Sequence, residues 1–66
     1  MNNNLKVERA IKNITQEQLA KNIGVTRQAI NSIELVKYIP STVLALKLSR
    51  YFNKTVNEIF TLEETD

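Results

Sequence analysis

The sequence has no cysteine and no histidine among its 66 residues. Their absence excludes disulfide bonds, thiol chemistry and the usual zinc sites, so packing alone must hold the fold together. A short chain without a cross-link or a metal usually needs closely packed helices or a partner chain for stability. We therefore expect no metal site and no cofactor.

Glycine and proline are also scarce, since Gly24 and Pro40 are the only ones in the chain. No linker, repeat or low-complexity segment follows the opening asparagines, and no apolar run approaches the roughly 20 residues that span a bilayer. The polar start, MNNN, is not typical of a signal peptide. We expect one domain over residues 1–66, in the cytoplasm and without membrane contact.

The charge is unevenly distributed, although its total is only +2. Three of the seven acidic residues lie in the last six positions, so residues 1–60 carry nine basic against four acidic side chains. A basic body with an acidic tail suits a phosphate-bearing partner. The alternative is ordinary surface charge that keeps the protein in solution.

Apolar residues recur at helical rather than strand spacing, so we expect an all-α domain. The five expected helices lie at about residues 4–13, 16–23, 27–35, 42–52 and 56–60. In and just after the first helix, the expected apolar contacts come from Val7, Ala10, Ile11 and Ile14. The acidic tail, residues 61–66, is expected to be frayed, paired with the N-terminus or part of a dimer contact.

Two helices begin with the pattern of a capping box, Thr15-x-x-Gln18 and Thr55-x-x-Glu58. Gly24 follows the second helix, where the chain often needs a positive φ that glycine adopts without strain. Only three residues, 24–26, then separate the second helix from the third. Such a short link forces a sharp angle and leaves one helix projecting, as in a helix-turn-helix that enters a DNA major groove.

The outward face of the third helix is found by removing Ile30 and Ile33, which face inward. It then presents the polar side chains Arg27, Gln28, Asn31 and Ser32. Arginine can bind guanine in a bidentate manner, and glutamine or asparagine can do the same with adenine. The alternative is an ordinary polar face in contact with solvent. The absence of any carboxylate on this face argues against that alternative.

Four segments appear in the order typical of one family: residues 15–20 (TQEQLA), 24–30 (GVTRQAI), 33–34 (IE) and 37–41 (KYIPS). Through them, residues 4–60 resemble the lambda-repressor-like helix-turn-helix family (XRE, Cro/repressor type), especially its short stand-alone members. The resemblance implies a compact five-helix fold, no enzymatic activity, and binding of double-stranded operator DNA as a homodimer, most often as a repressor.

The resemblance also implies roles for individual residues. The base-reading positions correspond to Arg27, Gln28, Asn31 and Ser32, with Gln28 foremost. The DNA-backbone positions correspond to Gln16, Thr26, Lys37 and Tyr38. Arg9 and Glu34 correspond to a largely buried ion pair between the first and third helices.

A dimer contact is expected near the C-terminus, at Val56, Ile59, Phe60 and Leu62, where short family members associate. Apolar side chains left over after the core is filled mark such an interface. The alternative is that Phe60 closes the core of the single chain.

The sequence departs from the family after Glu34, where Leu35 and Val36 replace the usual Asn-Gly. Either the third helix continues by a turn, or these side chains pack on Ile39. Thr42 is a second departure, since leucine is common there, and it weakens the expected anchoring of the fourth helix.

Other function classes have less support. An enzyme is poorly supported, since the chain has no histidine or cysteine, no convergent carboxylate pair on a predicted face and no glycine-rich phosphate loop. No small-molecule ligand is expected, since 66 residues leave little room for a large pocket. A protein-interaction module, such as an antitoxin component that pairs with another protein, is the remaining alternative.

Overall fold

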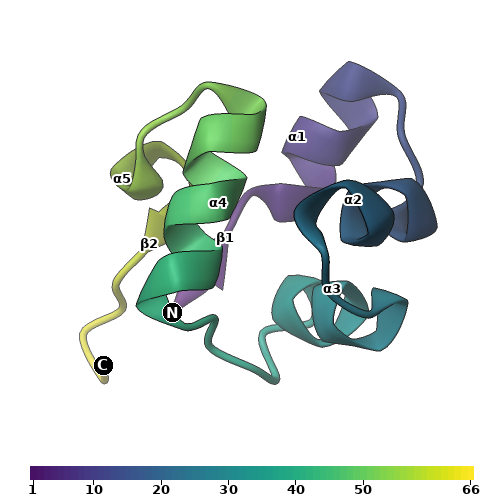
Figure 1. The fold of residues 1–66 in the computed structure, drawn as a ribbon. Helices are drawn as coiled ribbons and strands as arrows, with labels where there is room; N and C mark the ends of the chain where they lie inside the picture. Colours follow the sequence, from purple (N-terminus) through teal and green to yellow (C-terminus); the bar gives the residue numbers. More distant parts are fainter.

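The structure, a computed structural model that describes all 66 residues, contains five helices and one very small sheet. The helices are α1 (Leu5–Lys12), α2 (Gln16–Ile23), α3 (Arg27–Glu34), α4 (Thr42–Phe52) and α5 (Val56–Ile59). The strands are β1 (Asn2–Asn3) and β2 (Phe60–Thr61). Helices α1, α2 and α3 form one half of the molecule, and α4, α5 and the strands form the other (Figure 1). The expected five-helix domain is confirmed.

Local hydrogen bonds explain where the helices begin and end. Both expected capping boxes are present, and the Thr26 and Ser41 hydroxyls each accept a hydrogen bond from a backbone N–H at the start of α3 and α4. Gly24 ends α2 with φ +86°, and a Cβ there would meet no atom within 4 Å. The left-handed backbone, rather than lack of space, therefore favours glycine at this position.

One core holds the two halves together. It consists of Leu5, Leu19, Ala20, Ile23, Ile30, Ile33, Leu44, Leu48, Phe52, Ile59 and Phe60. None of the helices combines the length and apolar character needed to cross a bilayer.

Of the apolar contacts expected from the first segment, that of Ile14 is confirmed, since it packs against the core, and the other three are wrong. Val7 and Ile11 are 55% and 70% exposed, Ala10 is exposed, and only Leu5 is buried. The physical reason is that Leu5 and Arg9, one helical turn apart, occupy the inward side of α1. Val7 and Ile11 therefore lie on its solvent side.

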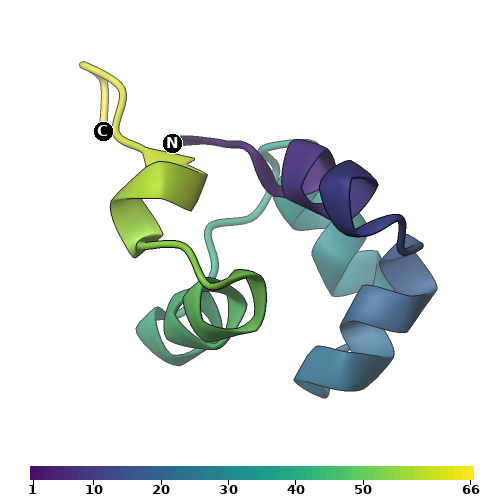
Figure 2. The ribbon, with the colours of Figure 1, turned by 90° about the horizontal axis from the view of Figure 1, so that it is seen from above.

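The two ends of the chain lie side by side (Figures 1 and 2). Asn2 pairs with Thr61 and Asn3 with Phe60 in an antiparallel register, and the Asn4 N–H donates to the Ile59 carbonyl at 2.8 Å. The start of the tail is thus paired with the N-terminus. This pairing is one of the alternatives expected for the tail, but its form as two strands was not expected, because two residues per strand are too few to show strand periodicity.

The loop after α3 does not continue the helix by a turn, the first of the two expected paths. Helix α3 ends at Glu34, and Leu35 and Val36 are both exposed. Val36 has φ +61° and its N–H donates to the Ile33 carbonyl, which closes the helix end as glycine commonly does. A β-branched residue is rare in this conformation, so the turn stores strain at Val36.

Candidate nucleic-acid interface

The helix-turn-helix is formed by α2 and α3. The link of residues 24–26 turns the chain at Gly24, and the Thr26 cap starts α3, which lies below α2 in Figure 1. Ala20 is buried in α2, and Ile30 and Ile33 are buried in α3. With this inner side of α3 fixed to the core, its opposite side faces solvent.

The solvent side of α3 forms a polar depression of about 360 Å³ together with the start of α2. It is lined by Gln16, Arg27, Gln28, Asn31 and Ser32, without a hydrophobic side chain. The structure therefore brings together all four residues expected to read bases, and Gln16 of α2 lies beside them. No carboxylate lines this depression, which leaves it suitable for electron-rich base edges and phosphates.

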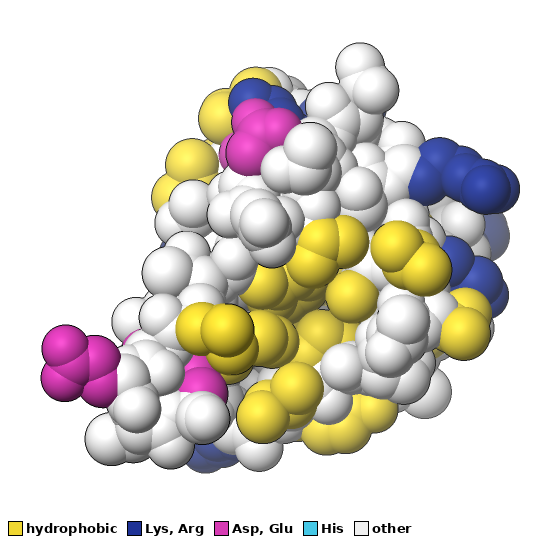
Figure 3. Space-filling model, turned by 90° about the vertical axis from the view of Figure 1, so that its left-hand side faces the viewer, with side chains coloured by type: hydrophobic (Ala, Val, Ile, Leu, Met, Phe, Trp, Pro, Cys, Tyr) yellow, Lys and Arg dark blue, Asp and Glu magenta, His cyan; other side chains and the backbone are white.

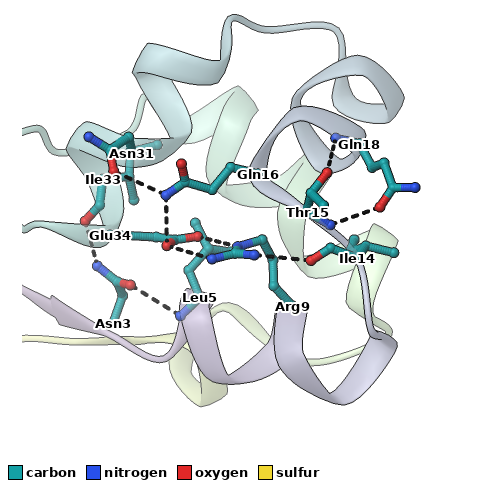
Figure 4. Close-up of polar contacts among 10 residues, drawn as sticks. All are labelled: Asn3, Leu5, Arg9, Ile14, Thr15, Gln16, Gln18, Asn31, Ile33 and Glu34. Carbon is teal, nitrogen blue, oxygen red and sulfur yellow. Dashed lines mark hydrogen bonds and ion pairs between the residues drawn. The ribbon is translucent and has the colours of Figure 1, made fainter.

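A chain of hydrogen bonds connects this depression to the interior (Figure 4). Arg9 donates to both carboxylate oxygens of Glu34, from Nε to Oε2 at 2.6 Å and from a terminal nitrogen to Oε1 at 3.1 Å. The Gln16 amide nitrogen donates to Glu34 Oε1 and to Asn31 Oδ1, both at 3.1 Å. Four side chains from α1, α2 and α3 are thus hydrogen-bonded in series.

The Arg9–Glu34 ion pair is largely removed from water, with side-chain exposures of 15% and 5%. The hydrogen bond from Arg9 to Glu34 raises the pKa of Arg9 above its ordinary value, which keeps the guanidinium charged. Arg9 also donates to the Ile14 carbonyl at 3.0 Å. The pair therefore fixes α3 to α1 and to the turn that precedes α2.

A second depression, of about 410 Å³, adjoins the first at the start of α2 and includes Thr15, Gln16 and Glu17. Arg27 lines both depressions. Because a helix N-terminus presents free N–H groups and a positive dipole end, this region suits a phosphate oxygen. Arg27 thus lies at the boundary between the two depressions.

The other expected backbone contacts lie apart from these depressions. Lys37 and Tyr38 are exposed in the loop between α3 and α4. The Thr26 hydroxyl accepts a hydrogen bond from the Ala29 N–H at 3.1 Å, so its first role is to cap α3. Its hydroxyl hydrogen remains available to an acceptor.

The residues expected at a dimer contact divide into two groups. Ile59 and Phe60 are buried in the core of the single chain, with exposures of 0% and 5%, whereas Val56 is half-buried and Leu62 is 77% exposed. Only Val56 and Leu62 therefore offer substantial surface to a second copy.

An apolar surface gathers on the α4, α5 and β2 side of the molecule, away from α2 (Figures 1 and 3). Two hollows of about 340 and 460 Å³ adjoin there and share Met1, Val56 and Phe60. We call this surface the apolar face and define it by Met1, Ile39, Leu46, Val56, Phe60 and Leu62. Sequence reasoning missed Met1 and Ile39, because neither belongs to a helix whose periodicity would assign it.

A family model described as helix-turn-helix matches residues 5–59. The chain belongs to the XRE-type helix-turn-helix family. Its five helices are those of a lambda-repressor-like domain.

The XRE-type chain is similar to several short proteins along its whole length. It is 47% identical over 66 residues, all of both chains, to an HTH-type transcriptional regulator of Methanocaldococcus jannaschii. It is 42% identical over 64 residues, 97% of both chains, to the HTH-type transcriptional regulator YgzD of Bacillus subtilis. It is also 38% identical over 63 residues to the HTH-type transcriptional activator BcrR of Enterococcus faecalis, covering 96% of this chain and 31% of that protein.

Proposed function

We propose that this chain is a sequence-specific regulator of transcription that binds double-stranded DNA as a homodimer and represses from a palindromic operator. The observation that carries the proposal is the polar depression on α3, where Arg27, Gln28, Asn31 and Ser32 lie together without a carboxylate. These side chains have the donors and acceptors that read base edges in the major groove.

The broader class, a DNA-binding transcriptional regulator, rests on the family. Relatives that match the chain from end to end are named as HTH-type transcriptional regulators. Repression is the more specific part of the proposal. A domain that occupies the operator would repress by preventing other proteins from binding there. The longer Enterococcus faecalis relative is named as an activator, so the direction of regulation needs its own test.

The backbone contacts proposed for DNA come from the side chains of Thr26, Lys37 and Tyr38 and from the start of α2 at Gln16. Lysine supplies a charge to a phosphate, and a hydroxyl or an amide supplies a hydrogen bond. The start of α2 lies beside Arg27 on one side and residues 13–15, which precede α2, on the other. Its free backbone N–H groups make this a favourable position for a phosphate.

The apolar face supports the homodimer. Two copies joined there around a two-fold axis would hold their recognition helices on outer sides, since the apolar face lies away from α2. Half-sites one helical turn apart, about 34 Å, are within reach of two such chains, because each extends 32 Å along its longest axis. Relative to the sequence-based expectation, the proposed contact keeps Val56 and Leu62 and gains Leu46 and Ile39.

The test is selection of bound duplexes from random DNA, followed by binding measurements at several salt concentrations. We expect a short palindrome and a logarithmic salt slope of about −0.9 for each phosphate neutralised. A reporter gene placed behind the selected site then distinguishes repression from activation. Binding without sequence preference at every salt concentration would contradict the proposal.

The apolar face also supports a second candidate, a protein-interaction module such as an antitoxin component. A partner protein, rather than a second copy, would then cover Leu46 and Leu62. A monomer that co-purifies with another protein in fixed ratio, and selects no DNA sequence, would favour this candidate.

A further inference from the structure

Asn31 is joined to the buried Arg9–Glu34 pair through a single side chain, Gln16 (Figure 4). We propose that Glu34 sets the orientation of the Asn31 amide through Gln16, so that Asn31 presents hydrogen-bond donors to DNA and prefers guanine. The inference rests on the proposed DNA-binding function and names the base chemistry of one of its contacts.

The first step is the orientation of Gln16. An ionised carboxylate only accepts hydrogen bonds, and Glu34 already accepts two from Arg9. Whatever end of the Gln16 amide faces Glu34 must therefore be the donating end. The structure has this arrangement, with the Gln16 nitrogen 3.1 Å from Glu34 Oε1.

The second step is the orientation of Asn31. The Gln16 amide nitrogen has two hydrogens, and the second points to Asn31, which must offer an acceptor. Asn31 does so with Oδ1, at 3.1 Å from the Gln16 nitrogen. Its own amide nitrogen forms no hydrogen bond within the chain and belongs to an exposed side chain in the polar depression.

The third step concerns the base. Asparagine binds adenine through both ends of its amide, with the oxygen accepting from N6 and the nitrogen donating to N7. Asn31 Oδ1 is directed to Gln16 and uses one of its two lone pairs there, so the –NH₂ group is the end with no contact inside the chain. Guanine offers two acceptors in the major groove, O6 and N7, whereas cytosine offers a donor. The expected order at this position therefore places guanine first and cytosine last, with adenine below guanine.

Gln16 consequently acts as a positioning residue. Both of its amide hydrogens are used within the protein, and its remaining oxygen cannot bind a phosphate oxygen. A phosphate at the start of α2 is then bound by backbone N–H groups instead of the Gln16 side chain.

The test compares Gln16→Met with the parent protein in selection from random duplexes. The base position read by Asn31 is first identified as the position that becomes indifferent in Asn31→Ala. In the parent we expect guanine there over adenine by about tenfold. In Gln16→Met, Asn31 is free to turn either end outward, so the preference should fall to within about twofold. The positions read by Gln28 should not change.

Gln18→Met is the matched control, because Gln18 lies on the same helix but bonds only to Thr15. It should keep the guanine preference of the parent. If Gln16→Met fails to fold by circular dichroism, Asn31→Asp replaces it: the carboxylate still accepts from Gln16 but cannot donate, so cytosine should become the preferred base. Adenine selected by the parent protein, or a guanine preference unchanged in the folded variant, would overturn the inference.

A measurement without DNA separates this inference from the proposed function. In the free protein, the side-chain amide hydrogens of Gln16 should exchange with solvent more slowly than those of Asn31 in nuclear magnetic resonance spectra. Slow exchange at Gln16 with no selected DNA sequence would retain the orientation but reject DNA reading. Equal, fast exchange at both residues would reject the orientation itself.

Discussion

The side of the molecule around α2 and α3 and the apolar face across from it differ in what their side chains contact. Around α2 and α3, four polar side chains are hydrogen-bonded in series, from Arg9 through Glu34 and Gln16 to Asn31. On the apolar face, Ile39, Leu46 and Leu62 are more than half exposed. One side is complete within the single chain, whereas the other has surface that only a partner can bury.

This difference separates two properties that DNA recognition needs. The shape of the reading surface is set by hydrogen bonds within one chain, so it should survive in a monomer. In the proposed homodimer, the number of base pairs read depends on the apolar face, because one recognition helix reaches only a few. Variants should therefore damage one property without the other.

The largest effect is expected for Arg9→Ala. The change leaves the Glu34 carboxylate buried without its partner, which costs about 3–5 kcal/mol of the free energy of unfolding. Urea denaturation measures the loss. Lys6→Ala, at an exposed position of the same helix, should stay within about 0.5 kcal/mol of the parent. Equal urea midpoints for Arg9→Ala and the parent would disprove the role of the ion pair.

Leu46→Asp tests the apolar face and should weaken the proposed homodimer. A charge on the apolar face should raise the dissociation constant of the homodimer at least about tenfold while the chain stays folded. Sedimentation velocity over a range of concentrations measures this change. Val7→Asp is matched in exposure, 55% against 57%, but lies on α1, and it should leave the dimer intact. A parent protein that is monomeric at tens of micromolar would reject the interface.

Gln28→Ala tests the reading surface itself. Truncation should cost about 1–3 kcal/mol of DNA-binding free energy and relax preference at one or two base positions. Binding titrations with the selected duplex and its single-base variants measure both effects. Since Gln28 is exposed, the urea midpoint and the dimer should not change. A uniform loss across all sequences would instead mark Gln28 as a backbone contact.

The smallest effect is expected for Val36→Gly. Left-handed backbone costs an ordinary residue about 1–2 kcal/mol, and glycine adds about 0.5–1 kcal/mol of folding entropy. The variant should therefore gain up to about 1.5 kcal/mol of unfolding free energy in urea. Leu35→Gly is the control, because the neighbouring Leu35 is similarly exposed at φ −83° and should lose stability. A loss in both variants would mean that Val36 packing outweighs its backbone strain.

Much of the fold was predictable because interactions between residues close in sequence set the helix boundaries. Thr15, Gly24 and Thr55 each act on backbone groups within four residues, so their effect can be inferred from spacing alone. The solvent side of α3 followed in the same way, once Ile30 and Ile33 were assigned to the core.

The parts that were missed depend on contacts between distant residues. Periodicity showed that α1 has an apolar side, but Val7 and Ile11 are exposed because the helix docks through Leu5 and Arg9 instead. The Gln16–Asn31 hydrogen bond joins two helices whose relative rotation no spacing rule gives. Val36 has a positive φ that valine rarely adopts, so its residue type gives no hint of this conformation. The conformation is seen only in the structure, where Val36 closes the end of α3.

The short ladder between the chain ends has a consequence for the order of folding. Helices α2 and α3 are neighbours in sequence and can associate by closing a loop of a few residues, whereas β1 and β2 must close nearly the whole chain, from Asn3 to Phe60. Contacts of that range reduce folding rates, since the loop must close before they form. Helix α3 should therefore pack on α2 early in folding. The hydrogen bond from the Asn4 N–H to the Ile59 carbonyl should form last.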